Sequence, residues 1–205
     1  GEVMSIGKTY KEAFKKAIRS LAKGRYGPGH VKNFNDLSKE ELLQLLITPS
    51  SERHFQMYEA IRKGATVDEL HEITKINKYF ITQMQELVDE EEDLVNAFKG
   101  CVPSDASLIR AKQDGFSDKY LSEILDVPEE DIRNRRYAID CVEDYDNIHV
   151  AGTKASAYYY STYHKATDGG NRVSDSNKKI MILGGGPNRI GQGIEFDYCC
   201  VHAAL

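Results

Sequence analysis

The sequence predicts a mainly α-helical protein whose last residues begin an α/β unit. Apolar residues recur at helical spacing between residues 9 and 136. Within this region, two helix-turn-helix patterns follow each other at a fixed offset. Near the C-terminus, an apolar run, a glycine-rich loop and a helical pattern indicate one strand, a turn and one helix. The predicted fold is therefore helical, with a short strand-loop-helix segment at its end.

Five helices are expected in the first hundred residues, each with start and stop signals. The third can be capped by Ser50 or Ser51 and is ended by Gly64, and the longest covers about residues 77–98. The other three begin at a capping box, in which a hydroxyl and a glutamate three residues later satisfy each other's backbone N–H groups. These pairs are Thr9 with Glu12, Ser38 with Glu41 and Thr66 with Glu69.

An acidic run, Asp89–Asp93, lies in the longest predicted helix. Adjacent helical positions point around the circumference, so these carboxylates cannot converge on one ion. The run therefore favours a solvated face over a metal site.

The middle of the chain contains an internal near-repeat with an offset of 51 residues, marked by Gly64 and Gly115. Each copy is expected to form a helix, a short turn and a second helix, and two copies can pack face to face around a shared core. The matched pairs are Thr66 with Ser117, Leu70 with Leu121, Ile73 with Ile124, Ile76 with Val127, and Ile81 with Ile132.

The C-terminal segment has a different character. The apolar run Lys179–Leu183 predicts a strand buried on both faces of a parallel sheet, and residues 194–205 predict a helix. A parallel strand needs neighbours and a crossover, so we expect the chain to be a piece of a longer protein. The loop between them departs from both phosphate-binding fingerprints at Arg189 and Gln192, which favours a tight strand-to-helix turn.

Composition excludes several classes of function. The net charge of −5 gives no electrostatic case for a nucleic acid or an anionic membrane as partner. No run approaches the roughly 18 apolar residues of a membrane span, and no signal peptide is visible. The four cysteines and six histidines lack the spacing of a zinc site or a catalytic group. We therefore expect a cytoplasmic chain that carries no catalytic residue and no cofactor or metal site of its own.

Both ends of the chain resemble one family. The stretch GGGPNRIGQGIEFDY, residues 184–198, is similar to the opening of the second synthetase half of carbamoyl phosphate synthetase large subunits. The stretch GEVMSIGKTYKEAFKKA, residues 1–17, resembles the close of the first, ATP-grasp half, and the middle resembles the family's oligomerisation, or connection, domain. The resemblance implies four segments: the end of the carboxyphosphate half at 1–24, the helical oligomerisation domain at 25–150, an extended linker at 151–177, and the truncated pre-ATP-grasp start of the carbamoyl-phosphate half at 178–205.

The resemblance also implies a function for the parent enzyme, an ATP-dependent carbon–nitrogen ligase. That enzyme makes carbamoyl phosphate from bicarbonate, glutamine-derived ammonia and two ATP, for arginine and pyrimidine synthesis. It uses magnesium or manganese and potassium, and it works with a small glutamine amidotransferase subunit and other large subunits. The ATP-grasp residues are expected outside this chain, which should therefore be inactive alone and act as a structural segment that could form a homodimer.

Three residues match family positions that line a passage for carbamate between the two halves: Glu2, Gly193 and Glu195. Met4 is a further candidate, and without the rest of the protein we expect Glu2 and Glu195 to lie far from their working positions. For association between subunits, Tyr79 and Phe80 are the candidate residues.

Two other interpretations stay open from the sequence. The chain could be a helical interaction module of another ATP-grasp ligase, although such a module would carry a different glycine loop. It could also be a helix-turn-helix DNA-binding protein, because Arg133, Arg135 and Arg136 lie on the second helix of the second copy. The acidic net charge disfavours that reading.

Overall fold

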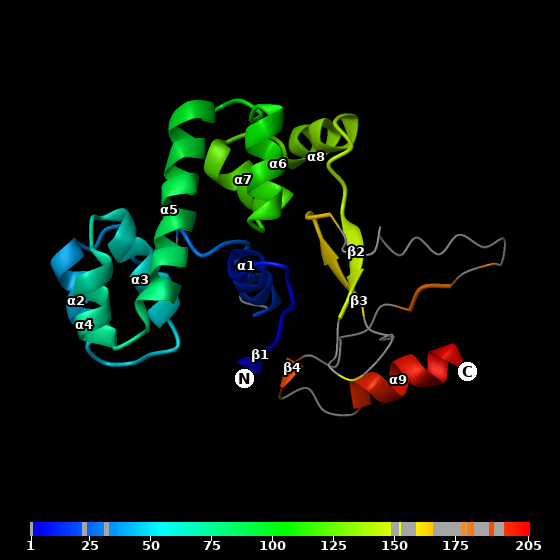
Figure 1. Cartoon of the computed structure of the whole chain (residues 1–205), viewed down its shortest axis with the longest axis horizontal. Coiled ribbons are helices and arrows are strands. Elements are labelled where there is room, and N and C mark those ends of the chain that lie inside the picture. Colours follow the sequence, from blue (N-terminus) through cyan, green and yellow to red (C-terminus); the bar gives the residue numbers. More distant parts are fainter. Residues whose placement is uncertain are drawn as a thin grey trace.

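Helices dominate the part of the chain that the structure describes, as predicted (Figure 1). The computed structural model describes residues 2–21, 24–30, 33–148, 152, 159–165, 178, 180–182, 189–190 and 195–205. The helices are α1 (Tyr10–Ser20), α2 (Lys39–Leu46), α3 (Arg53–Arg62), α4 (Val67–Thr74), α5 (Lys78–Phe98), α6 (Asp105–Gln113), α7 (Asp118–Leu125), α8 (Glu129–Ala138) and α9 (Glu195–Ala204). The strands are β1 (Glu2–Val3), β2 (Asp144–Asn147), β3 (Tyr159–Thr162) and β4 (Arg189–Ile190).

Two of the three predicted capping boxes are complete. Ser38 with Glu41 begins α2, and Thr66 with Glu69 begins α4. The capping box predicted at Thr9 is wrong for one of its two hydrogen bonds, the one from the Thr9 N–H to the Glu12 side chain. The Thr9 hydroxyl accepts the Glu12 N–H at 3.2 Å, but the Glu12 carboxylate accepts the Lys8 N–H at 2.8 Å instead of closing the box.

Neither serine predicted to cap α3 does so. The N-cap is Glu52, which makes no side-chain capping bond. The hydroxyl of Ser50 instead accepts the Glu52 N–H at 3.3 Å, so this serine stabilises the turn that precedes the helix.

The internal repeat is confirmed, and it extends to three helices per copy: α3, α4 and α5 match α6, α7 and α8 at the same offset. Gly64 and Gly115 end the first helix of each copy with the same φ of +89°. The turn before the third helix also repeats, since Lys75 and Asp126 both adopt the left-handed conformation, at φ +57° and +58°.

A side-chain bond across that turn repeats as well. The His71 Nδ1 contacts the Ile76 carbonyl oxygen at 2.7 Å, and the Ser122 hydroxyl donates to the Val127 carbonyl at 2.7 Å. The matched residues His71 and Ser122 therefore each bond a carbonyl across the turn, one with an imidazole and the other with a hydroxyl. The similarity lies in the backbone path, which the apolar and turn residues define.

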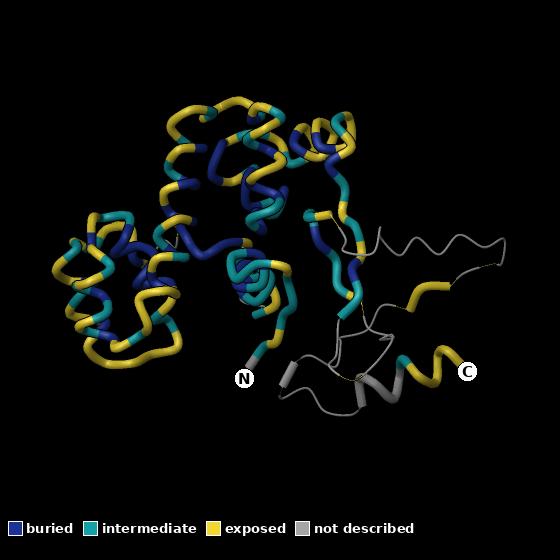
Figure 2. Tube along the Cα trace, viewed as in Figure 1, coloured by how far each residue is buried: buried dark blue, intermediate teal, exposed yellow. Residues whose placement is uncertain are grey.

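Helices α3 and α4 lie at one end of α5 and α6 and α7 at the other, so the two copies do not pack face to face as expected (Figure 1). Helix α5 packs against α3 and α4 along one part of its length and against α7 along another. Even so, the copies share one contiguous core, which confirms that part of the prediction. Figure 2 shows buried positions along the helix sides that face one another. Core members from α2 to α8 include Leu42, Leu46, Leu70, Leu108, Leu121 and Ile132.

Helix α1 belongs to the same core, through Phe14 and Ile18. The segment predicted as the end of the preceding half thus packs directly on the helical middle. The boundaries at residues 24, 150 and 177 stay predictions about the family's organisation.

Two small antiparallel sheets lie beside the helices. In one, β2 pairs with β3, with Asp144 opposite Thr162 and Asn147 opposite Tyr159. In the other, β1 near the N-terminus pairs with β4, with Glu2 opposite Ile190 and Val3 opposite Arg189. Among the described residues, no helix is both long and apolar enough to cross a membrane.

The strand predicted at Lys179–Leu183 is not formed where the structure describes it. Ile180, Met181 and Ile182 have no regular structure and are exposed by 81%, 81% and 39%. A parallel strand is stabilised by hydrogen bonds to neighbouring strands. Strand pairing in the described part of this segment is found further along the chain, in β4, which is two residues long. The helix expected after the loop is present as α9, whereas most of the glycine loop lies outside the described residues.

Candidate functional site

Two of the predicted passage residues, Glu2 and Glu195, belong to elements that the structure describes. Glu2 lies in β1 opposite Ile190 of β4, and Glu195 is the first residue of α9. The structure describes the backbone of these two glutamates, and Gly193 lies outside the described residues. Met4 is 56% exposed and lines a cavity of about 650 Å³ together with Ile6 and Ser161. The role of these four residues in a passage stays a prediction.

The acidic run in α5 is where the sequence-based prediction fails. Asp89 and Asp93 are exposed as expected, but Glu90 is 6% exposed and Glu91 is fully buried. The prediction is wrong for these two because α5 is covered on more than one side, by α3 and by α7. Within the described part of the chain, no group of three or more His, Cys, Asp or Glu side chains is arranged to hold a metal ion.

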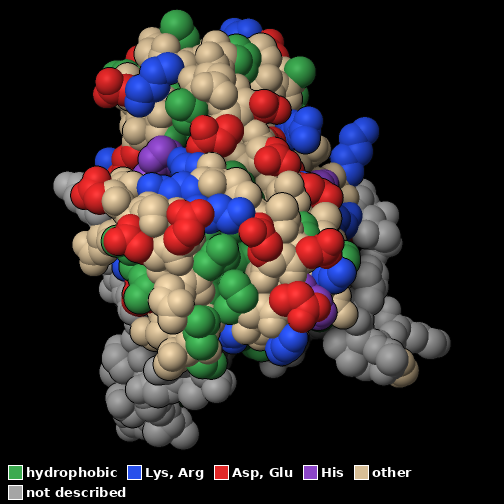
Figure 3. All heavy atoms as spheres, turned by 90° about the vertical axis from the view of Figure 1, so that its left-hand side faces the viewer, with side chains coloured by type: hydrophobic (Ala, Val, Ile, Leu, Met, Phe, Trp, Pro, Cys, Tyr) green, Lys and Arg blue, Asp and Glu red, His purple; other side chains and the backbone are tan. Residues whose placement is uncertain are grey.

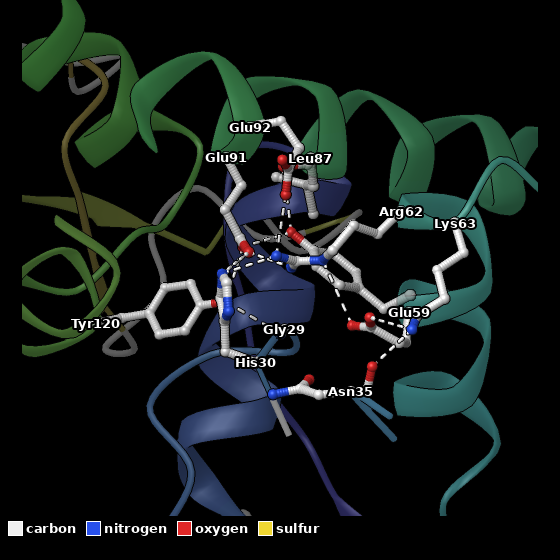
Figure 4. A network of polar contacts seen from close by, with 11 residues as sticks. Gly29, His30, Asn35, Glu59, Arg62, Lys63, Leu87, Glu91, Glu92 and Tyr120 are labelled. Carbon is white, nitrogen blue, oxygen red and sulfur yellow. Dashed lines mark hydrogen bonds and ion pairs between the residues drawn. The ribbon is translucent and has the colours of Figure 1, made fainter. Parts of the chain in front are cut away.

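Glu91 is the centre of a buried polar network (Figure 4). Its Oε2 accepts hydrogen bonds from the hydroxyls of Tyr58, at 2.8 Å, and Tyr120, at 2.7 Å. Its Oε1 accepts a hydrogen bond from the Arg62 guanidinium. Tyr58 and Arg62 belong to α3 and Tyr120 to α7, so one carboxylate on α5 joins both copies of the repeat.

The loop at residues 24–30 closes this network. The Gly29 N–H donates to the Tyr120 hydroxyl at 3.1 Å. A Cβ at Gly29 would lie 2.6 Å from that hydroxyl oxygen, so the position needs glycine for close approach. His30 lies beside the Glu91 carboxylate, with 3.3 Å between Nε2 and Oε1.

The network keeps Glu91 ionised. Burial alone would raise the pKa of Glu91, but His30, Arg62, Lys15 and Tyr120 hold it at about 2. Burial and the nearby charge of Glu91 raise the pKa values of Tyr58 and Tyr120 well above 10, so both hydroxyls remain donors. A charge that is fully paired in this way fixes the relative positions of helices, because moving any one of them leaves a buried group unsatisfied.

Two further ionisable side chains are buried, Lys15 of α1 and Glu90 of α5, next to Glu91 in the sequence. The Lys15 ammonium is fully buried over the Phe116 ring and has no hydrogen-bond partner among the described residues. Burial lowers the pKa of Lys15 well below its usual value. Burial and the neighbouring carboxyl of Asp114 raise the pKa of Glu90 to about 8, although Lys15 and Arg110 act in the opposite direction.

Exposed apolar side chains form the candidate association surface. Figure 3 shows hydrophobic side chains grouped among charged ones on the face that carries α2 and α4. Leu45 and Ile47, at the end of α2, are 43% and 57% exposed. Tyr79 and Phe80, named from the sequence, are 56% and 42% exposed, and both rings pack against Tyr10.

Sequence reasoning missed Leu45 and Ile47, although a signal was present. Helix α2 contains four leucines within eight residues. Leu42 and Leu46, four residues apart, are fully buried, and Leu43 is partly buried against the same core. One buried stripe cannot accommodate every apolar residue of so short a helix, so some had to point outward.

The arginines that motivated a DNA-binding reading are already paired. Arg135 makes two bonds of 2.7 Å to Asp105, and Arg133 bonds to Glu129. Arg136 is buried and contacts Asp118 at 3.0 Å. Phosphate contact would require these pairs to break, so the structure disfavours a helix that reads duplex DNA.

Comparison with known proteins gives a consistent result. Residues 2–140 match the family model described as carbamoyl-phosphate synthetase large chain, oligomerisation domain, and residues 176–205 match the carbamoyl phosphate synthase preATP-grasp domain. The chain is similar to proteins named carbamoyl phosphate synthase large chain from Neisseria meningitidis serogroup A (44% identity), Archaeoglobus fulgidus (41%) and Pseudomonas aeruginosa (40%). Each match includes the whole of this chain but 19% of the relative, so the chain spans about a fifth of their length.

Proposed function

Because the chain belongs to the family of carbamoyl phosphate synthetase large chains, we propose that it connects the two halves of such an enzyme and brings large chains together. The observation that carries this proposal is the match of residues 2–140 to the family's oligomerisation domain. Two features support it: a contiguous core that spans both copies of the repeat, and the apolar side chains that remain exposed on α2 and α5.

We further propose that the whole enzyme is an ATP-dependent ligase that forms carbamoyl phosphate from bicarbonate, ammonia and two ATP. The names of the relatives support this reaction, and one from Arabidopsis thaliana is described as arginine-specific, which supports a role in arginine synthesis. In this proposal ATP, magnesium or manganese, and potassium bind elsewhere in the enzyme. The small amidotransferase subunit supplies ammonia, and this chain contributes no catalytic group.

The passage for carbamate is a separate proposal, with Glu2, Gly193 and Glu195 as lining residues. Its support is the pairing of β1 with β4, in which the backbone of Glu2 lies opposite Ile190, a residue of the glycine-rich loop itself. Carboxylates along such a passage would repel an anion from the walls, while glycine leaves room for it.

Sedimentation equilibrium of the chain tests the proposed association. We expect Leu45→Glu and Ile47→Glu to shift a dimer or larger assembly to monomer, because each places a charge in an apolar contact. Gln44→Glu is the matched control, since it adds the same charge at an exposed neighbouring position of α2 and should leave association intact.

The variant Tyr79→Ser separates the two candidate surfaces. Dissociation by Tyr79→Ser but not by Leu45→Glu would place the contact at the start of α5. A wild-type chain that stays monomeric at about 100 μM would contradict association through this segment alone.

A further inference from the structure

Two stretches that are far apart in the chain meet on α1. The first, residues 2–8, leads into the helical part of the chain and is called here the entry segment. The second, residues 144–147 and 159–165, contains β2 and β3, follows the helical part and is called the exit segment. Both are bound by polar side chains of α1, although the whole helical repeat lies between them in the sequence.

The entry segment is held closely against α1. The Ser5 hydroxyl donates to the Ala13 carbonyl at 2.6 Å, and the Lys8 N–H donates to the Glu12 Oε2 at 2.8 Å. A Cβ at Gly7 would lie 2.8 Å from the Ala13 nitrogen, so the backbone can approach this closely only with glycine at that position. Hydrogen bonds and shape together therefore fix the entry segment on α1.

The exit segment binds the same face of α1. The Glu12 Oε2 also accepts a hydrogen bond from the Thr162 hydroxyl at 3.1 Å, and the two residues are 2% and 1% exposed. The Lys16 Nζ lies 3.2 Å from the Glu12 Oε1, and it donates to the Ile6 carbonyl at 2.9 Å and to the Ser161 carbonyl. The carboxylate of Glu12 and the ammonium of Lys16 therefore each contact both segments.

A further ion pair joins the two segments directly. The Lys8 Nζ lies 2.9 Å from a carboxylate oxygen of Asp146 in β2, a residue that is 3% exposed, and it also donates to the Lys165 carbonyl. Hydrogen bonds to charged groups are short and directional. In a buried network of such bonds, moving one member leaves its partners unsatisfied, so the network favours a single arrangement of the two segments.

Helix α1 separates this network from the helical core. Glu12 and Lys16 are four residues apart and so lie on one face of the helix. Phe14 and Ile18, also four residues apart, belong to the core that α1 shares with the repeat. One face of α1 thus binds the entry and exit segments, and another binds the helices that lie between them in the sequence.

We propose that Glu12 and Lys16 are positioning residues, which hold the entry and exit segments in one relative placement and thereby align the two halves of the enzyme. This inference rests on the proposed function of the chain as a connector between those halves. The helical repeat then supplies association between chains, whereas the Glu12–Lys16 pair supplies the alignment of the passage between the halves.

The variant Thr162→Val tests this role, because it removes one hydroxyl from the exit segment and changes no residue of α1 or of the entry segment. We expect the Lys8 amide, measured by NMR hydrogen exchange, to exchange roughly tenfold faster, as for loss of one hydrogen bond to a charged group of the same network. The Thr162 hydroxyl also accepts the His164 N–H at 3.1 Å, so exchange at His164 reports the local effect and exchange at Lys8 the transmitted one.

Two further variants make the result specific. Thr162→Ser keeps the hydroxyl and should restore the slow exchange of the Lys8 amide. Thr74→Val is the matched control, because it makes the same change at another buried threonine, whose hydroxyl donates to the Leu70 carbonyl at 2.6 Å within the helical repeat. Unchanged exchange at Lys8 in Thr162→Val, or equal acceleration in Thr162→Val and Thr74→Val, would overturn the proposal.

The same variant tests the consequence for the whole enzyme. A misaligned passage should lose carbamate to water, so Thr162→Val should raise the amount of ATP consumed per carbamoyl phosphate formed, and Thr162→Ser should restore the ratio. An unchanged ratio in a Thr162→Val enzyme whose Lys8 amide exchanges faster would overturn the role in alignment. The exchange measurement depends neither on association nor on catalysis, so a failure of the proposed connector function is distinguishable from a failure of this inference.

Discussion

Glu91 shows what one buried charge contributes to this molecule. Removing a carboxylate from water is costly, and the cost is offset only where every oxygen finds a donor. Here Arg62, Tyr58 and Tyr120 supply those donors from two other helices. Such a site adds little net stability over an apolar core of the same volume, but it allows only one arrangement of the helices.

We predict that Glu91→Gln destabilises the chain by about 3 kcal/mol, because it leaves the Arg62 charge poorly compensated in a buried site. Urea unfolding at pH 7 measures the change. The control is Glu92→Gln, which removes a second, 41% exposed partner of Arg62 and should cost under about 1 kcal/mol. Because the pKa of Glu91 is held at about 2, the penalty should shrink as the pH falls below about 4.5. Equal losses in the two variants would contradict this role.

Glu90 predicts a pH dependence of the opposite sign. Burial raises its pKa to about 8, so the folded chain holds a proton that the unfolded chain releases near pH 4.5. The free energy of unfolding should therefore fall as the pH rises from about 5 to about 8. Glu90→Gln should remove part of this slope, and it should be more stable than the wild type at pH 8 but not at pH 5. The measurement is the urea midpoint at both pH values, and an unchanged slope in Glu90→Gln would refute it.

Neither buried glutamate could be predicted from the sequence around it. Asp89–Asp93 is a typical solvated run, and only the docking of α3 and α7 turns its middle inward. The same limit explains the error at Thr9. Its capping hydroxyl was predicted, but the Glu12 carboxylate binds the Lys8 N–H and also the hydroxyl of Thr162, 150 residues away, at 3.1 Å. Local patterns define which groups are available, and distant segments decide where they bind.

At the scale of elements, the repeat is the feature that the sequence predicted best. Turn residues and apolar positions carry it, and both depend on short-range sterics and on helical spacing. The extent of α5 and two capping boxes were predictable for the same reason. The strand at Lys179–Leu183 was not, because a strand is stable only through neighbours that local sequence cannot supply.

The repeated turns give a prediction about backbone strain. Lys75 adopts a left-handed conformation at φ +57°, which costs a residue with a Cβ about 1 kcal/mol. Lys75→Gly should therefore stabilise the chain by about 0.5–1 kcal/mol, because its exposed ion pair with Glu72 contributes little. Gly64→Ala should destabilise it by about 1 kcal/mol, since no atom lies within 4 Å of the added Cβ and only the φ of +89° opposes it. Thermal unfolding should show shifts of opposite sign, and shifts of the same sign would contradict the assignment.

At the scale of the whole molecule, the placement of the copies along α5 decides what is left exposed. Face-to-face packing would have hidden more of each copy, whereas an end-to-end arrangement leaves α2 and the start of α5 facing outward (Figure 1). The sequence predicted the copies but not this arrangement, because the residues that set it, Tyr58 and Tyr120, belong to different copies. In the same arrangement, residues of α1, α7 and α8 line one polar pocket of about 340 Å³.

The shared core predicts that the two copies unfold together. Leu70 and Leu121 occupy matched positions, and both are fully buried. Each change to alanine should cost about 2–5 kcal/mol. If the copies are one cooperative unit, Leu121→Ala should lower the hydrogen-exchange protection of α4 as much as that of α7, because the Glu91 network and the contiguous core couple them. Leu70→Ala should produce the reciprocal loss in α7. Protection that falls only in the mutated copy would mean that α5 joins two independent units, and the proposed role as a rigid connector would then fail at its main physical requirement.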